Sequence, residues 1–354
     1  MKYVNLPLAI EIENKKVLKK TAAARAALAE LKGTALSIPN EHILVNTLSL
    51  QEAKDSSAIE NIITTHDELY QSDSLAENYK SLASKEIYHY NTALKRGYEI
   101  VKATGLLLNR DIIRIQSVIK ESNSGFRKQA GTTLKNEKTQ EVIYTPPQTQ
   151  EEIIILMSNL EKYINDEMLS DEDPLVKMAI IHHQFESIHP FYDGNGRVGR
   201  IINILYLVKE DLLESPILYL SRYINQHKQQ YYALLQKVRD EKDWESWVLF
   251  ILEAVIETSK QTIRLIHKIK ELMLFHKNKI REELPKIYSQ DLLNNIFKHP
   301  YTKIHFMMDE LNVSRITAVK YLEELKKKGI LHKEKIGKEN FYINVKLYEL
   351  LSLH

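Results

Sequence analysis

The sequence predicts a mainly α-helical protein with two short β segments. Only 10 glycines and 9 prolines occur among 354 residues, and these residue types interrupt helices most strongly. Apolar side chains recur at helical spacing, as in residues 175–188. Runs rich in β-branched and aromatic residues beside polar turns are confined to 132–144 and 331–345. The expected fold is therefore a helical body carrying a small hairpin, followed by a second small β unit near the end of the chain.

Composition and charge exclude several classes of protein. Hydrophobic residues make up 44% of the chain and charged residues 27%, as expected for a globular protein with room for two or three domains. The chain has no run of about 18 apolar residues, and charges are scattered through its N-terminus, so neither a membrane span nor a signal peptide is expected. The absence of cysteine excludes disulfides and thiolate metal sites, and it fits a cytoplasmic protein. A net charge of +2 gives no general attraction to nucleic acid.

The first hundred residues are predicted to be helical. An alanine-rich segment, residues 17–32, forms the first helix, and Gly33 is its expected stop. Pro39 then breaks the chain, and the next helix is expected at 48–69.

The most informative segment runs from His189 to Arg200 and reads His-Pro-Phe-Tyr-Asp-Gly-Asn-Gly-Arg-Val-Gly-Arg. It lies between the predicted helix 175–188 and a second apolar run. Pro190 and Gly194 interrupt the helical pattern. The segment therefore forms a loop that ends at a helix N-terminus, where unpaired backbone N–H groups and the helix dipole favour an anion.

The residues of this loop suit a bound polyphosphate. Successive N–H groups of Asn195, Gly196 and Arg197 would surround phosphate oxygens, and glycine allows a close approach of the backbone. Arg197 and Arg200 would add bidentate, permanently charged contacts. The candidate nucleotide-binding residues of the loop are thus Asp193, Gly194, Asn195, Gly196, Arg197 and Arg200.

Two residues of the loop suit catalysis. Asp193 offers a hard oxygen ligand for a Mg²⁺ ion that also binds phosphate oxygens. His189 has an ordinary pKa of about 6.5, so near pH 7 it can act as a neutral base that takes a proton from a hydroxyl group.

Two other interpretations of this loop are weaker. The stretch from Gly194 to Gly199 matches the dinucleotide pattern GxGxxG, but a helix rather than a strand precedes it, so the βαβ context is missing. A purely structural loop with a buried histidine would not require the aspartate, the Gly-Asn-Gly turn and the two arginines together.

Residues 189–200 closely resemble the signature of the Fic family (filamentation induced by cyclic AMP), His-x-Phe-x-Asp/Glu-Gly-Asn-Gly/Lys-Arg-x-x-Arg, at every fixed position. The resemblance implies transfer of AMP from ATP to a hydroxyl side chain of a protein. On this analogy His189 is the catalytic base and Asp193 holds Mg²⁺. Gly196 resembles the AMP-transferring majority of the family, because the death-on-curing branch, which phosphorylates its target, has lysine there.

A second motif resembles the inhibitory helix of the family, Ser/Thr-x-x-x-Glu-Gly/Asn. Ser56, Glu60 and Asn61 match it. Ser56 and Glu60 are four residues apart and so point to the same side of a helix. By resemblance, Glu60 would pair with Arg200 and occupy the place of the ATP γ-phosphate. The alternative is an ordinary solvated helix face.

The predicted hairpin has β-branched and aromatic residues on both sides of a polar turn at 135–140. It resembles the flap of Fic proteins, whose exposed edge binds a segment of the target protein by main-chain pairing. Val142, Ile143 and Tyr144 are the expected docking residues. A surface hairpin without a function is the alternative.

Tyr231 and Tyr232 follow the signature at the distance at which related Fic proteins line the adenine pocket. Neighbouring residues on a helix diverge by about 100°. Core packing is therefore the alternative for whichever of the two faces inward.

The last part of the chain is predicted to be a winged helix-turn-helix. Residues 304–311 and 316–328 form the two helices, with Ser314 capping the second, and 331–345 forms a two-stranded wing. Residues 281–354 contain 13 Lys and Arg against 10 Asp and Glu, a small excess for a DNA-binding surface. DNA binding and a protein-interaction or dimerisation role both remain open.

The sequence thus predicts a Mg²⁺- and ATP-dependent protein adenylyltransferase that acts on Ser, Thr or Tyr hydroxyls of target proteins and of itself, and that Glu60 inhibits. Expected partners are target proteins, a second copy of the chain in a homodimer, and DNA through residues 285–354, with no membrane. The alternatives are a hydrolase that removes AMP and a transcription regulator in which the Fic core is a sensor. The predicted parts are a helical segment with the inhibitory helix (1–100), the catalytic core (101–255), a helical connector (256–284) and the winged helix-turn-helix (285–354).

Overall fold

The computed structural model describes residues 4–74, 81–135, 139–336 and 339–352. Helices dominate, and the β structure consists of one two-stranded and one three-stranded antiparallel sheet in these residues. The predicted mainly helical fold is therefore confirmed. None of the helices in the described ranges has the length and apolar character needed to cross a membrane.

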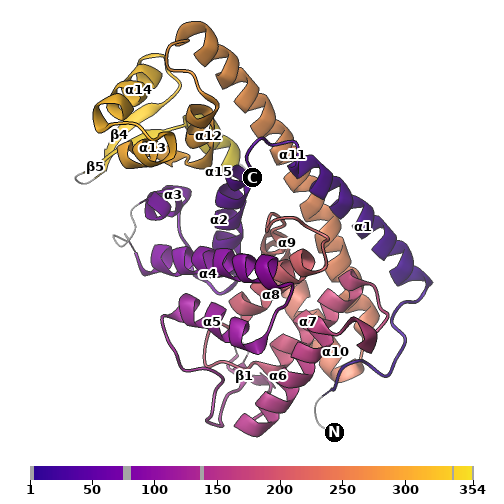
Figure 1. The fold of residues 1–354 in the computed structure, drawn as a ribbon. Helices are drawn as coiled ribbons and strands as arrows, with labels where there is room; N and C mark the ends of the chain where they lie inside the picture. The colour runs from indigo at the N-terminus through magenta and orange to yellow at the C-terminus, as the bar shows by residue number, and fades with distance from the viewer. Residues whose placement is uncertain (1–3, 75–80, 136–138, 337–338, 353–354) are drawn as a thin grey trace.

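The N-terminal segment contributes a long helix and the motif of Ser56, Glu60 and Asn61. Its helices are α1 (Lys15–Ala35), α2 (Glu41–Ile59) and α3 (His66–Ser74). Helix α1 lies along α11 (Trp244–Glu283), as Figure 1 shows. Helix α1 continues through Gly33, so the predicted stop at that glycine is wrong.

The second predicted helix, 48–69, is also wrong in its extent. Helix α2 ends at Ile59 and α3 begins at His66. The break follows from the backbone of Asn61, whose φ of 62° is left-handed and cannot continue a right-handed helix. Glu60 is consequently the C-cap of α2, and its side chain lies at the C-terminal end of the helix.

The helical core surrounds α7 and α8. Its elements are α4 (Leu82–Thr104), α5 (Asn109–Lys120), α6 (Gln150–Asn165), a 3₁₀ turn (Glu167–Leu169), α7 (Pro174–Ile188), α8 (Asn195–Lys209), α9 (Leu220–Gln226) and α10 (Lys228–Glu241). Helix α7 is apolar around most of its circumference and is buried accordingly. Gly97 of α4 lets α8 approach, because a Cβ there would lie 2.6 Å from Leu205 Cδ1.

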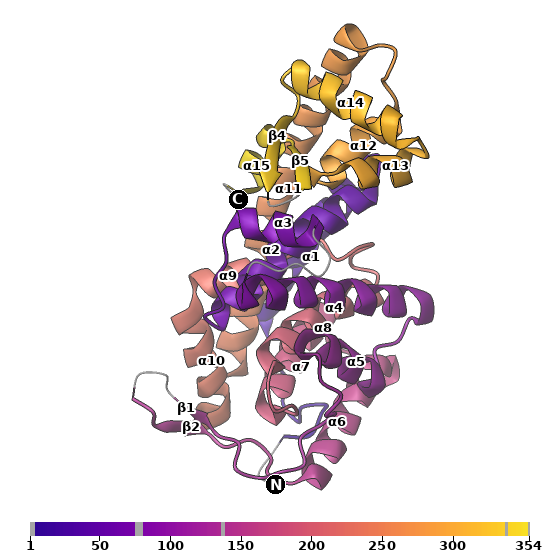
Figure 2. The same ribbon diagram turned by 90° about the vertical axis from the view of Figure 1, so that its left-hand side faces the viewer.

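The predicted hairpin is present as a short two-stranded ladder. Strand β1 (Leu134–Lys135) pairs antiparallel with β2 (Val142–Tyr144). Part of its predicted turn, residues 136–138, lies outside the described residues. Figure 2 shows the two strands beside the lower end of α10.

The C-terminal module is compatible with the predicted winged helix-turn-helix. It contains α12 (Gln290–Lys298), β3 (Tyr301–Thr302), α13 (Ile304–Leu311), α14 (Arg315–Lys327), β4 (His332–Ile336), β5 (Glu339–Ile343) and α15 (Val345–Ser352). The Ser314 side chain caps α14 as predicted. The sheet has three strands in the order β3-β5-β4 rather than two, because residues 301–302 extend the wing.

The C-terminal module packs against the N-terminal segment. Tyr301 of β3 stacks on Tyr70 of α3 at a ring-centroid distance of 6.1 Å, and its hydroxyl donates to Asp67 at 2.6 Å. The Tyr70 hydroxyl in turn accepts from Gln51 of α2 at 2.7 Å. The module at the end of the chain is thus in contact, through α3, with the helix that carries Glu60.

Candidate active site

The loop of the signature is bounded by two left-handed residues. His189 caps the C-terminus of α7 with φ 49°, and Gly194 precedes α8 with φ 83°. Helix α8 begins at Asn195, a few residues before the apolar run that predicted it. The N–H groups of residues 195–197 are therefore the first of a helix, and these have no intrahelical acceptor.

The side chain of Asn195 holds the loop closed. Its Oδ1 accepts from the backbone N–H of Phe191 at 2.8 Å, and its Nδ2 donates to the Phe191 carbonyl at 2.8 Å. Asn195 is buried, so both amide ends are satisfied within the loop. The group of Asn195 that is left to contact an anion is therefore its backbone N–H.

His189 lies in a buried, cationic environment. Burial lowers its pKa to about 4, and the nearby Arg127 and Arg239 act in the same direction. The imidazole is therefore neutral at pH 7 and able to accept a proton.

Arg127, which the sequence analysis did not single out, contacts the signature loop. It is fully buried, and its Nε donates to the His189 carbonyl at 2.9 Å, while its backbone N–H donates to the Pro190 carbonyl at 2.8 Å. Its Nη2 donates to the Pro147 carbonyl beyond the hairpin. Arg127 thus joins the loop to the hairpin segment.

Asp193 forms two polar contacts at the rim of the loop. Its Oδ1 accepts from the Gly194 N–H at 2.6 Å, and its Oδ2 pairs with Lys120 Nζ at 2.7 Å. Partial burial opposes ionisation, but the contact with Lys120 outweighs it and lowers the pKa of the Asp193 carboxyl. The carboxylate is therefore ionised at neutral pH.

The donor set around Asp193 suits a metal ion that arrives with phosphates. Among the residues that the structure describes, no three His, Cys, Asp or Glu side chains gather to hold an ion. Mg²⁺ commonly binds one or two carboxylates and takes its other ligands from water and substrate phosphates. Asp193, next to the N-terminus of α8, fits that pattern.

Arg197 is paired with a glutamate that no local pattern in the sequence indicated. Its Nη1 contacts Glu86 of α4 at 2.5 Å. The Glu86 carboxylate also lies 3.8 Å from Lys120. This loop therefore has a second acidic side chain beside Asp193.

The structure pairs Glu60 with Arg200, which is 140 positions away along the chain. Arg200 Nη2 lies 2.9 Å from Glu60 Oε1. The same guanidinium donates through Nε to Ser56 Oγ at 2.7 Å and through Nη2 to the Ser56 carbonyl at 2.9 Å. The Arg200 side chain is only 2% exposed and that of Glu60 is 37% exposed. Ser56 and Glu60 thus both accept hydrogen bonds from the Arg200 guanidinium.

Gly196 is needed for this arrangement. A Cβ at position 196 would lie 2.3 Å from Glu60 Oε1 and 3.0 Å from Arg200 Nη1. Any side chain there would displace the carboxylate. The glycine that permits a close approach to an anion also permits the close approach of Glu60.

Asn61, the third residue of the candidate inhibitory motif, is held at the same turn. Its Oδ1 accepts from Lys228 Nζ of α10 at 3.1 Å. Its left-handed backbone ends α2 and places the Glu60 side chain toward α8.

The two candidate adenine-pocket tyrosines differ in burial. Tyr231 is 1% exposed, and its hydroxyl contacts His182 Nε2 at 2.8 Å. Tyr232 is 45% exposed, and the two rings meet edge to face at 5.1 Å. Tyr231 therefore packs in the core, and Tyr232 is the one available to a ligand.

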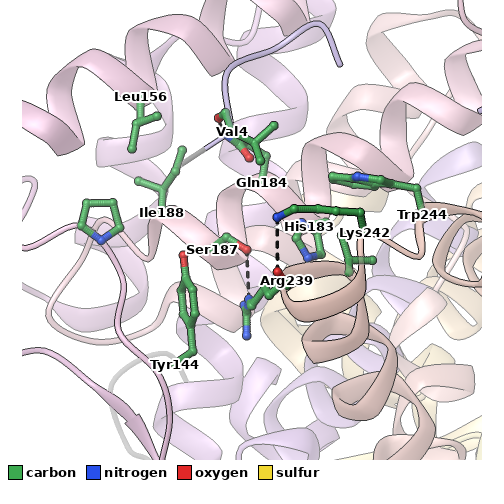
Figure 3. A pocket seen from close by; sticks show the side chains of 12 residues that line it. Val4, Tyr144, Leu156, His183, Gln184, Ser187, Ile188, Arg239, Lys242 and Trp244 are labelled. Carbon is green, nitrogen blue, oxygen red and sulfur yellow. Dashed lines mark hydrogen bonds between the residues drawn. The ribbon is translucent and has the colours of Figure 1, made fainter. Parts of the chain in front are cut away.

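The hairpin lies on α10 with two apolar side chains exposed. The Ile143 carbonyl accepts from Gln236 at 3.3 Å, and the Arg239 guanidinium lies 4.1 Å from the Tyr144 ring centroid. Figure 3 shows Tyr144 and Arg239 on the wall of a cavity of about 70 Å³. Val142 and Ile143 are 53% and 44% exposed, as a docking edge requires.

Comparison with known proteins identifies the class of this fold and site. Family models described as "Fic/DOC family N-terminal" and "Fic/DOC family" match residues 18–99 and 106–207. A third, "Protein adenylyltransferase SoFic-like, C-terminal domain", matches residues 272–347. The chain belongs to the Fic/DOC family.

Individual relatives are distant. Over 107 residues, the chain is 30% identical to the protein adenylyltransferase Fic of Drosophila erecta and 31% identical to that of Drosophila mojavensis. The matched residues make up 30% of this chain in each case. The match spans only 20% of the length of those relatives.

Solved structures share the fold. A Fic family protein from Desulfovibrio desulfuricans has a TM-score of 0.60 at 19% identity, covering 95% of this chain and 97% of that one. A Fic domain-containing signaling protein from Bacteroides thetaiotaomicron has a TM-score of 0.55 at 17% identity, covering 69% of this chain and 97% of that one. At these identities the likeness concerns the fold.

Proposed function

We propose that this protein is an adenylyltransferase that transfers AMP from ATP to Ser, Thr or Tyr hydroxyls of target proteins and of itself, and that Glu60 holds it inactive. The supporting observations are its membership of the Fic/DOC family and the name of its curated relatives. The observation that carries the regulatory part is the ion pair between Glu60 and Arg200.

In this proposal the loop binds the nucleotide and His189 performs the proton transfer. The first N–H groups of α8, together with Arg197 and Arg200, would hold the phosphates. His189 would take the proton of the incoming hydroxyl, whose oxygen attacks the α-phosphorus as pyrophosphate leaves. Asp193 would hold Mg²⁺, which neutralises phosphate charge.

Glu60 would oppose this reaction by occupying Arg200. A γ-phosphate and a carboxylate compete for the same guanidinium, so the ion pair would leave the triphosphate in an unproductive position. Displacing Glu60 would free Arg200 for the nucleotide.

The exposed side chains of β2 support the docking of a target segment. Val142 and Ile143 are both exposed on a two-stranded ladder whose edge a third strand can join. Tyr232 is the proposed contact for the adenine ring.

The test is the fate of the label of radioactive ATP. AMP transfer predicts that protein incubated with Mg²⁺ becomes labelled from α-labelled but not from γ-labelled ATP. Label from the γ-position would instead mean phosphorylation. The reverse activity, removal of AMP, is tested separately by starting from modified protein.

Arg127 should act as a positioning residue for His189. Arg127→Ala removes the hydrogen bond to the His189 carbonyl, and small misplacement of a catalytic group can cost about 10²-fold in rate. We expect kcat for label transfer to fall by that order while KM for ATP changes little. Arg127→Lys, which keeps the charge but not the planar fork, should recover part of the rate. A rise in KM with unchanged kcat would contradict this role.

Asp193 and Mg²⁺ should act as one unit. Asp193→Ala and chelation of Mg²⁺ should each stop label transfer, and the variant should show no additional loss on chelation, since both remove the same bridge to the phosphates. Titration of rates against free Mg²⁺ measures this. Asp166→Ala is the matched control. It removes the aspartate that caps the 3₁₀ turn Glu167–Leu169, and this variant should retain the Mg²⁺ dependence. If the losses from Asp193→Ala and from chelation multiplied, Asp193 would have a role other than holding Mg²⁺.

Cytoplasmic localisation, homodimer formation and DNA binding through residues 285–354 remain proposals. A gel-shift titration at several salt concentrations tests the last, because phosphate contacts give a steep salt dependence.

A further inference from the structure

A polar cavity of about 230 Å³ lies on the inhibitory helix, on a different side from Arg200. It is formed by α2, by His66 at the start of α3, by α9 and by Ser352 of α15. The eight described residues that line it are all polar. A single water needs only about 10–15 Å³, so the space is sufficient for a small molecule.

The cavity and the inhibitory contact use two faces of one helix. Gln51, Lys54 and Asp55 are spaced by three and four residues and line the cavity together. Ser56 and Glu60 follow at once and meet Arg200. Anything bound in the cavity therefore contacts the last turns of α2 before Glu60.

Two cations face the cavity without an ion pair. Lys54 and Arg222 line it, and neither forms a salt bridge within the described parts of the chain. Lys54 Nζ instead contacts the His66 ring at 2.9 Å. Burial, with the Lys54 charge, lowers the pKa of His66 to about 4, so this ring is neutral at pH 7. Asp55 is the one carboxylate among the described side chains that line the cavity, which leaves a positive excess among them.

We propose that this cavity binds a small oxyanion, a carboxylate or phosphate group, between Lys54 of α2 and Arg222 of α9. One negative charge would balance the excess of the two cations over Asp55. The amides of Gln51 and Asn225, also in the lining, can donate to the remaining oxygens.

The anion would strengthen the inhibited arrangement. It bridges α2 to α9, which are already joined by the Ser221 N–H that donates to Glu52 at 3.1 Å. A ligand that binds the arrangement in which Glu60 meets Arg200 more tightly than the arrangement in which Glu60 is displaced stabilises the former by the difference in binding free energy. This consequence rests on the proposed function, whereas the binding site does not.

The binding test is thermal unfolding of the full chain against inorganic phosphate, and separately against acetate, at constant ionic strength. We expect a saturable rise in the unfolding midpoint for wild type. Lys54→Met and Arg222→Met should each weaken the apparent affinity about tenfold, the loss typical of one charge-assisted hydrogen bond. Lys19→Met, which removes an exposed lysine of α1, should leave the curve unchanged.

Phosphate bound at the loop of residues 189–200 can be distinguished from phosphate bound in the cavity, because its effect on the unfolding midpoint would persist in Lys54→Met. The absence of a saturable shift in wild type, or an identical curve for wild type and Lys54→Met, would overturn the proposal. In the activity arm, phosphate should slow label transfer by Lys54→Met only at concentrations about tenfold higher than those that slow wild type. If phosphate binds with the predicted dependence on Lys54 while no label transfer occurs under any condition, the site stands and the proposed function fails.

Discussion

His189→Ala should lower label transfer by about 10²–10⁴-fold when it is introduced into the Glu60→Gly variant, where the inhibitory pair is absent. This is the usual loss when a general base is removed. The buried imidazole, with its pKa lowered to about 4, is in the neutral form that the reaction requires at pH 7. The initial rate of incorporation from α-labelled ATP measures the effect.

Nucleotide affinity provides the control for His189. ATP binding by His189→Ala should remain within a few-fold of the parent, because the N-terminus of α8 and the arginines hold the phosphates. His227→Ala, which alters a half-buried histidine stacked on Tyr223, should retain the rate. Undiminished transfer by His189→Ala would end the proposed mechanism.

Glu60→Gly should raise auto-modification about tenfold or more. A hydrogen bond to a charged group contributes about 1.5–3 kcal/mol, and 1.4 kcal/mol corresponds to a factor of ten. The Glu60 side chain is 37% exposed, so solvent screening places the effect toward the lower end of that range. Rates for wild type and variant, compared at equal protein and Mg-ATP concentrations, measure it.

Two further variants separate charge from backbone in this experiment. Glu60→Gln keeps the side-chain shape and loses the charge, so it should also activate. Glu60→Gly combined with Arg200→Ala should lose the gain, since the freed guanidinium is itself needed for the nucleotide. Equal rates for wild type and Glu60→Gly would mean that the end of α2 is an ordinary helix face.

The elements that local patterns specify could be predicted from the sequence. Helix α7 follows its apolar periodicity from Pro174 to Ile188, and α13 and the cap of α14 are where the turn signals place them. The end of α2 was not predicted, although residues 61–65 are an asparagine followed by four β-branched residues, which lower helix propensity. Its stop depends on the left-handed conformation of Asn61, which composition does not reveal.

The parts of the site made by distant residues were beyond local patterns. Glu86 and Arg127 belong to no recognisable motif. Their contacts with the signature loop form only when α4 and the hairpin segment fold against that loop. The meeting of Glu60 with Arg200 could be expected only through the family resemblance. Which tyrosine of the 231–232 pair faces inward likewise depended on the packing of α10 against His182.

The most direct test of the account is the mass of the protein after incubation with Mg-ATP. Wild type, Glu60→Gly and Glu60→Gly combined with His189→Ala are compared, and modified peptides are identified after digestion. We expect AMP on a Ser, Thr or Tyr of Glu60→Gly, far less on wild type, and none on the double variant. A phosphate in place of AMP, or equal modification of all three proteins, would contradict an adenylyltransferase that is held inactive by Glu60.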